Sequence, residues 1–344
     1  MPAQRLTDLT AAELDAHVEA ALQAQPAAIV QFSHSNRYDA TLLRQLDALC
    51  QRHGERLNVR FYGHYPNDTF DGQVLLNLPH VQHLTLDCLE VTHNLHAVGE
   101  LAQLRHFELQ HLRGETPHLL ALPNLRQLQR LRVSQDKGAP LDLAPIAEMP
   151  ALQALAISVQ AHNLAAVAGH PRLERLALHR MPASIGLAIV DTLPVLQHLS
   201  LAFGSRETMP ELASPSLRSL EVVRVKGLTD VPLQGLPHLE SLRAEDQAQV
   251  KALDLRNSPR LRALMLNNLT HLAALHGLRA SSLDDLRLLR LPALDLAALA
   301  TTELPATVRA LQLWSGKRGL DRQLESLQQQ LNIPAPPVPF GAGD

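Results

Sequence analysis

The chain has 344 residues, a formal net charge of -3 and a sequence pI of about 6.7. This balance excludes a strongly basic nucleic-acid-binding protein and gives no general attraction to an anionic membrane. Only two cysteines are present, Cys50 and Cys88, so a disulfide framework is excluded and a reducing compartment is indicated. We find no secretory signal and no apolar stretch long enough to cross a bilayer, and therefore expect a cytoplasmic protein.

The first 77 residues predict an α/β cap at the N-terminal end. Thr10 and Glu13 have the spacing of a capping box, which starts a helix that runs to about Gln23. A strand is expected at 28–32, a helix at 39–53 and a second strand at 57–62, where apolar residues alternate.

From about residue 78 to 313 the chain repeats the pattern Leu-x-x-Leu-x-Leu, with starts 21 to 25 residues apart. The first apolar positions of the successive repeats are Val81, Leu104, Leu128, Leu152, Leu173, Leu196, Leu217, Leu239, Leu261, Leu283 and Val308. Within each repeat, x-Leu-x-Leu-x predicts a short strand with its leucines directed inward and its x positions directed outward. Segments such as LDLAPIAEMP have apolar residues at helical spacing and predict a returning turn. The repeats therefore predict a stack of coils around parallel strands.

This pattern resembles the leucine-rich-repeat family, and in particular its short, internalin-like bacterial class. The resemblance covers about two-thirds of the chain and implies an α/β solenoid: a concave parallel sheet over residues 78–314, with short helices or 3₁₀ turns on the convex side. One departure is that the position three residues after the last strand leucine, where the family usually has Asn, is mostly apolar, as in Met181, Val225 and Leu269. An extra motif, Val250/Leu253/Leu255, predicts a shortened coil.

After the repeats we expect a C-terminal capping helix within 315–332. Leu320, Leu324, Leu327 and Leu331 would form its apolar face. The remaining segment, 333–344, is rich in Pro and Gly and is expected to be disordered.

The sequence contains no phosphate loop, GxSxG, HExxH or CxxC motif. Two enzymatic hypotheses remain open. His83 and His106 occupy the same position in successive repeats and could bind a metal with Asp87 or Glu108, but polar residues on an open surface that suit a partner are the favoured explanation. The loop Ser33–Asn36, with Asp39, Asp68 and Asp71, could be imagined as a hydrolase site, although a helix N-cap explains it too.

The outward strand positions are the strongest candidates for binding. They are polar or charged at the front, small in the middle and charged again at the back, with Trp314 and Arg287 as possible anchors of a partner. The candidate residues are His83, Thr85, Asp87, His106, Glu108, Arg130, Arg132, Ala154, Ala156, Ala177, His179, His198, Ser200, Glu221, Arg243, Glu245, Arg256, Arg287 and Trp314.

We therefore predict a non-enzymatic, monomeric protein that holds another protein on its concave sheet and needs no cofactor. In bacteria such a protein could be an immunity protein or an adaptor. The alternatives are an effector directed at a host cell and a metal-dependent or hydrolytic enzyme. A nucleic-acid partner would need a basic stripe, and the sequence does not provide one.

Overall fold

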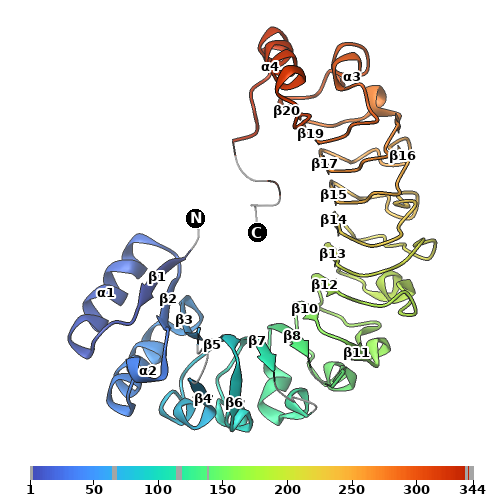
Figure 1. Cartoon of the computed structure of the whole chain (residues 1–344). Helices are drawn as coiled ribbons and strands as arrows, with labels where there is room; N and C mark the ends of the chain where they lie inside the picture. The colour runs from blue at the N-terminus through green and yellow to red at the C-terminus, as the bar shows by residue number, and fades with distance from the viewer. Residues whose placement is uncertain (1–2, 64–67, 114–117, 138, 338–339, 341–344) are drawn as a thin grey trace. The chain divides into compact units, whose positions relative to one another are not determined.

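The computed structural model describes residues 3–63, 68–113, 118–137, 139–337 and 340, without the side chains of 88, 89, 111–113, 136 and 137. These residues form two compact units, Met1–Val167 and Ala168–Asp344. Each unit consists of successive coils, in which a strand is followed by a returning segment (Figure 1).

The first unit contains a parallel sheet whose strands follow each other in chain order. Its strands are β1 (Gln4–Thr7), β2 (Ala28–Phe32), β3 (Leu57–Tyr62), β5 (His83–Leu89), β7 (His106–Arg113), β8 (Arg130–Lys137) and β10 (Ala154–Ser158). Helices α1 (Ala11–Ala24) and α2 (Ala40–His53) lie on the same side of this sheet as the returning segments of the later coils (Figure 1). The predicted capping box of α1 is present, and Asp39 caps α2.

The second unit continues with the same design of parallel strands in chain order. Its strands are β12 (Arg175–His179), β13 (His198–Ala202), β14 (Ser219–Val223), β15 (Ser241–Glu245), β17 (Ala263–Asn267), β19 (Asp285–Leu289) and β20 (Ala310–Trp314). Two helices belong to this unit: α3 (Leu296–Thr302), in the returning segment between β19 and β20, and α4 (Arg318–Leu331).

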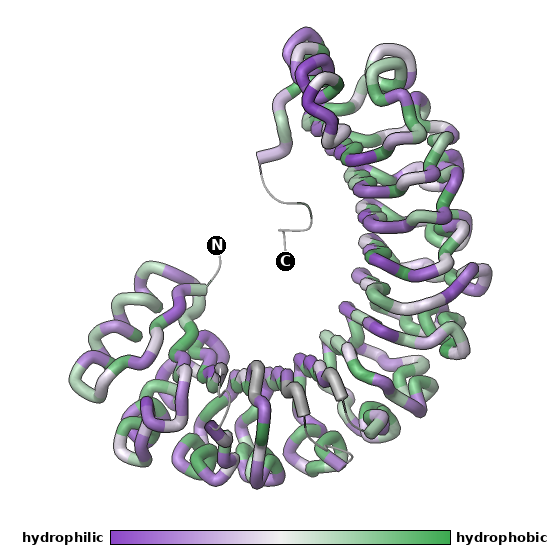
Figure 2. Tube along the Cα trace, viewed as in Figure 1, coloured by the Kyte–Doolittle hydropathy of each residue, from purple (hydrophilic) through white to green (hydrophobic). Residues whose placement is uncertain are grey.

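The repeat leucines form the core of every coil. In β13, for example, Leu199 is 1% exposed and Leu201 is buried, while His198 and Ser200 at the alternate positions are partly exposed. Hydrophobic and hydrophilic residues accordingly alternate at short intervals along both units (Figure 2). Because a shift of one residue would turn every leucine outward, this alternation fixes the register of the strands. The predicted solenoid of parallel strands is confirmed.

The returning segments are mostly short 3₁₀ turns. Within the coils they cover Gly72–Asn77, Leu95–Glu100, Leu119–Ala121, Pro123–Gln127, Ala144–Glu148, Leu164–Val167, Ala188–Thr192 and Leu278–Ala280, and two more lie at Ser35–Arg37 and Gly54–Arg56. Neighbouring returns also pair as small parallel sheets: β4 (Thr69–Asp71) with β6 (Val91–His93), β9 (Leu141–Asp142) with β11 (Ala161–His162), and β16 (Ala252–Asp254) with β18 (Ala274–His276). The prediction of a shortened coil at Val250/Leu253/Leu255 was wrong, because these residues belong to the returning segment that contains β16.

A left-handed residue ends each strand of the second unit from β12 to β19. It stands directly after the strand, and its N–H donates to a carbonyl of the next coil, as Phe203 N does to Val223 O at 2.9 Å. These residues are Arg180, Phe203, Arg224, Asp246, Asn268 and Arg290. In four of the coils the next residue is apolar and buried (Met181, Val225, Leu269 and Leu291). This is the position where the leucine-rich-repeat family usually has Asn, so its predicted apolar character agrees with the structure there.

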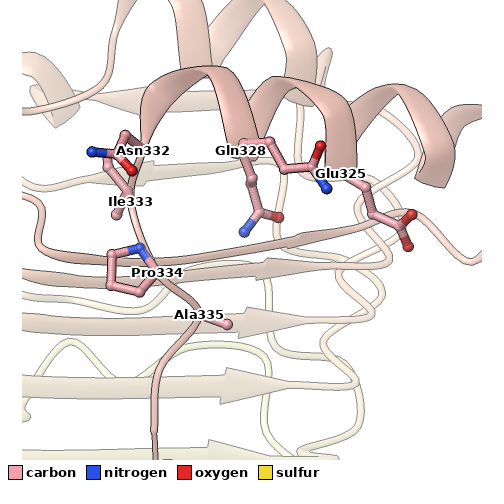
Figure 3. A pocket seen from close by; sticks show the side chains of 7 residues that line it. Glu325, Gln328, Asn332, Ile333, Pro334 and Ala335 are labelled. Carbon is pink, nitrogen blue, oxygen red and sulfur yellow. The ribbon is translucent and has the colours of Figure 1, made fainter.

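Helix α4 completes the edge of β20 with a side chain. The amide of Gln328 donates to Leu311 O at 2.7 Å and accepts from Leu313 N at 3.1 Å. Leu311 N in turn donates to Pro334 O at 3.0 Å, so the chain after α4 also lies against this edge. Figure 3 shows Gln328 and Glu325 of α4 beside Ile333, Pro334 and Ala335, around an open cavity of about 460 Å³.

Candidate functional site

We use the name strand face for the side chains that point away from the core at alternate positions of the main-sheet strands. In the first unit, neighbouring strands place these residues in three rows across the sheet. The first row is Asn58, His83, His106, Arg130 and Ala154; the second is Arg60, Thr85, Glu108, Arg132 and Ala156; the third is Tyr62, Asp87, Gln110, Ser134 and Ser158. The predicted residues of this unit therefore share one face.

His83 and His106 are direct neighbours on β5 and β7, as predicted, with ring centroids 5.0 Å apart and planes at 78°. Burial lowers the pKa of His83 to about 3, assisted by His106 and Arg130. Burial also lowers the pKa of His106, and the positive charge of Arg130 adds to this effect. Both imidazoles are therefore neutral at pH 7. His106 Nε2 is buried and lies 3.5 Å from a carboxylate oxygen of Glu55.

Arg60 is the centre of the polar contacts at the front of this face. Its guanidinium pairs with Asp87, donates to Gln31 Oε1 at 2.8 Å and lies 4.7 Å from the centroid of the Tyr62 ring. Asp87, one of the two carboxylates that the metal hypothesis considered beside the histidines, is thus paired with Arg60. Sequence analysis did not identify Arg60, whose position became clear only from the register of β3 against β5.

In the second unit, the strand face begins with small side chains. Ala177 lies beside Ser200 on β12 and β13, and Ser219 lies beside Ser241 on β14 and β15. These side chains are partly exposed. Because they are small, they form a shallow part of the strand face, which we call its floor. His179 borders the floor, with Nε2 3.3 Å from Ser200 Oγ.

Charged residues follow on β14, β15 and β19. Arg243 lies 3.7 Å from Glu221 on the neighbouring strand and donates to Glu245 on its own strand at 2.7 Å. Arg287, which is 6% exposed, donates to Asp285 at 2.7 Å and 2.9 Å. Met265 lies between these two arginines in the register of the strands. It was not among the predicted residues, because it is neither polar nor small. Arg243 and Arg287 are thus already paired with carboxylates of the strand face itself.

Trp314 is 45% exposed at the end of β20. The guanidinium carbon of Arg290 lies 5.8 Å from the centroid of its ring. Arg287 instead faces the ring of Phe340 at 5.2 Å. Trp314 therefore remains a candidate anchor, but its cationic partner differs from the one that the sequence suggested.

The placement of Arg256 on the strand face was wrong. Asp254 ends β16 on the returning side, and Arg256 lies just beyond it, where its guanidinium donates to Asp254 at 2.6 Å and 2.9 Å. The reason is that a short return strand also alternates apolar and polar residues, so the sequence pattern alone does not separate it from a main-sheet strand.

The serines of the hydrolase hypothesis are not arranged as nucleophiles beside a histidine base. Ser33 and Ser35 donate their hydroxyl protons to Asp8 and Asp68, respectively, and Asp68 also lies 3.2 Å from His34 Nδ1. A serine nucleophile needs a base that accepts its proton in the reaction, usually His, so hydrogen bonds to buried or half-buried carboxylates describe an anchored loop.

Across the described ranges, no three His, Cys, Asp or Glu side chains come together in a group that could hold a metal ion. Nor does any helix within those ranges have the length and apolar character needed to cross a membrane.

The coils thus share a strand of inward leucines and a returning segment, which is a short 3₁₀ turn in many of them, and the strands run parallel within each unit. This is the leucine-rich-repeat fold. No protein-family model matches the chain, and neither does any curated protein.

Solved structures of leucine-rich-repeat proteins are similar to the chain at low identity. An internalin (InlF) from Listeria monocytogenes has 19% identity and a TM-score of 0.45, over 72% of this chain and 73% of that one. The functional domain of InlJ from the same species, which includes a cysteine ladder, has 14% identity and a TM-score of 0.41, over 82% and 60% of the two chains. A chain of the Drosophila Toll–Spatzle complex has 14% identity and a TM-score of 0.40, over 83% and 43%. The chain thus spans less than two-thirds of the latter two proteins.

Proposed function

We propose that the chain is a non-enzymatic protein-binding module that holds another protein on its strand face. The observation that carries this proposal is the combination, in the second unit, of a low floor at Ala177, Ser200 and Ser219 with charged pairs beside it. Small side chains let the backbone of a partner approach the sheet closely. The charged pairs then select the orientation of that partner, because like charges placed opposite each other are unfavourable.

The geometry of these pairs supports a binding role over a purely structural one. Arg243 is shared between Glu221 and Glu245 and is partly exposed, so a partner's carboxylate could add to the cluster or replace one of its members. Exposed ion pairs contribute only about 0–1 kcal/mol to folding, so stability alone gives little reason for this arrangement.

We further place this activity in the cytoplasm, in the role of an immunity or adaptor protein. The support for this location is the cysteine content: the chain has only Cys50 and Cys88, which cannot form a disulfide framework, and the described one, Cys50, is a buried free thiol. An effector directed at another cell remains the alternative for the same binding face.

Ala177→Arg tests the proposal. The new side chain would rise from the floor of the strand face and block a partner, while the fold should persist because Ala177 is outside the core. Ala298→Arg is the matched control, since Ala298 is exposed on α3. We would capture proteins from the source organism on immobilised wild-type and variant chains. A protein retained by the wild type and Ala298→Arg but lost with Ala177→Arg supports the proposal; equal retention by all three contradicts it.

A further inference from the structure

A second surface lies beyond the strand ends of β12, β13 and β14. It surrounds Phe203, whose side chain is 50% exposed although large apolar side chains are normally buried. The residues at the same turn of the coils on either side are Arg180 and Arg224, both exposed. Three successive coils thus present cation, aromatic ring and cation in a line.

The backbone makes this choice of residues unusual. Phe203 has φ of +57°, and Arg180 and Arg224 have φ of +60° and +51°. In this left-handed region Gly and Asn are favoured, while a bulky side chain is strained. Asn268 shows that the same turn in a later coil does use Asn. The coil therefore needs a left-handed residue here, but it does not need a phenylalanine, and the aromatic ring calls for a separate explanation.

A cavity of about 400 Å³ opens beside the ring. Its lining comes from three coils: Arg180, Met181, Pro182, Phe203, Gly204, Ser205, Arg224 and Lys226. Every charged side chain in this lining is cationic. Gly204 is needed for the close approach of the coils, because a Cβ there would lie 2.8 Å from Met181 O.

Asp246 holds Arg224 in place near the Phe203 ring. Arg224 Nε donates to Asp246 at 2.6 Å, and its guanidinium carbon lies 6.0 Å from the centroid of the Phe203 ring. His179, the last strand-face residue of β12, lies edge-to-face with Phe203, with ring centroids 6.2 Å apart and planes at 80°. The ring of Phe203 therefore has both a cationic and an aromatic neighbour, and half of the side chain is still exposed.

We infer that this pocket binds an acidic segment of a partner protein that carries an apolar or aromatic side chain next to Asp or Glu. The exposed ring of Phe203 would contact the apolar side chain, and the carboxylate would bind Arg180, Arg224 and Lys226. Aromatic and arginine residues are the types that dominate binding energy at protein interfaces. Charge complementarity selects an acidic partner segment over a basic one.

A nucleic acid would also match a cation next to an aromatic ring. The neighbouring groups favour the acidic protein segment instead. Asp246 occupies the next turn after Arg224, so the positive charge does not extend along the coils as a phosphate backbone would require. The pocket adjoins the strand face through His179, which contacts both Ser200 and Phe203, but its own lining residues follow the strands, so it can be tested separately from the floor at Ala177.

Selection from a random displayed peptide library tests the inference. Wild-type chain would be the bait, and a Phe203→Asn chain would remove background binders. Asn suits the left-handed backbone, so this variant should keep the fold, which a urea midpoint no lower than that of the wild type would verify. Val195→Asn is the matched control: it makes the same change at another exposed apolar residue of this unit.

We expect the selected peptides to carry Asp or Glu next to an apolar residue. Their affinity should fall at least tenfold with Phe203→Asn, with Lys226→Gln, and when the acidic residues of the peptide become amides; Val195→Asn should leave it unchanged. Lys226→Gln keeps the test decisive if Phe203→Asn fails to fold. Failure to enrich any peptide over the Phe203→Asn chain, or enrichment of neutral or basic peptides, would overturn the inference. Displacement of the peptide by oligo-dT would assign the pocket to nucleic acid instead.

Discussion

The paired imidazoles of His83 and His106 make the first unit sensitive to acid. The pKa of His83 is lowered to about 3, whereas an unfolded chain restores the ordinary value near 6.5. Between these two values the unfolded state binds more protons than the folded state. Stability contributed by the neutral ring is thus complete above pH 6.5 and decreases as the pH falls towards 3.

The magnitude follows from the size of this shift. Each pH unit below 6.5 removes at most about 1.4 kcal/mol, so a change from about pH 7.5 to about pH 5 should lower the free energy of unfolding by about 2 kcal/mol through His83 alone. His106 changes in the same direction and adds to this loss, because burial and Arg130 lower its pKa too.

The assay is urea unfolding followed by far-UV circular dichroism at both pH values. His83→Gln replaces the imidazole with a neutral polar side chain, so its urea midpoint should decrease less between the two pH values than that of the wild type. His96→Gln is the matched control, because His96 is exposed in the same unit. If His83→Gln loses as much stability as the wild type on acidification, then His83 is not buried as a neutral ring and the reasoning fails.

Other substitutions test the coils themselves. Leu199→Ala removes a core side chain that is 1% exposed and should lower the free energy of unfolding by about 2–5 kcal/mol; an unchanged denaturation curve would refute the register of β13. Gly204→Ala places a Cβ against Met181 O and should cost about 1–3 kcal/mol in the same assay, whereas no loss would mean that the coils separate easily. Gln328→Ala leaves Leu311 O and Leu313 N without their amide partner and should cost about 1–3 kcal/mol; light scattering would reveal any association through the opened edge. Arg256→Ala, on the returning side, should change stability by less than about 0.5 kcal/mol and leave partner capture unaltered.

The repeat could be read from the sequence because the leucine alternation is strict and a one-residue shift would expose the core. The same reasoning failed at Leu253, where a return strand of only three residues has a similar alternation. Short helices were expected in the returning segments, but the bounds of α3 were not, because its Leu-Ala-Ala-Leu sequence is too short to show helical periodicity, although Asp295 caps it. Local patterns do not reveal on which side of a coil a short element lies.

The binding surfaces were less accessible to sequence reasoning than the fold. The strand face follows from alternation, so His83, His106 and Ala177 could be placed correctly. Phe203 could not be identified, because it lies one residue after its strand and its exposure depends on a left-handed turn. The signal that would have found it is an aromatic residue at a position where other coils have Asn or Arg.

The side chain of Gln328 also determines where the array of coils stops. Its amide presents one acceptor and one donor to β20, in the places where a further strand would supply a carbonyl and an N–H. Pro334 O accepts from Leu311 N on the same edge, so helix α4 and the segment after it together cover the last strand. An engineer who removed α4 and joined another coil after Trp314 would therefore extend the sheet without redesigning any earlier coil.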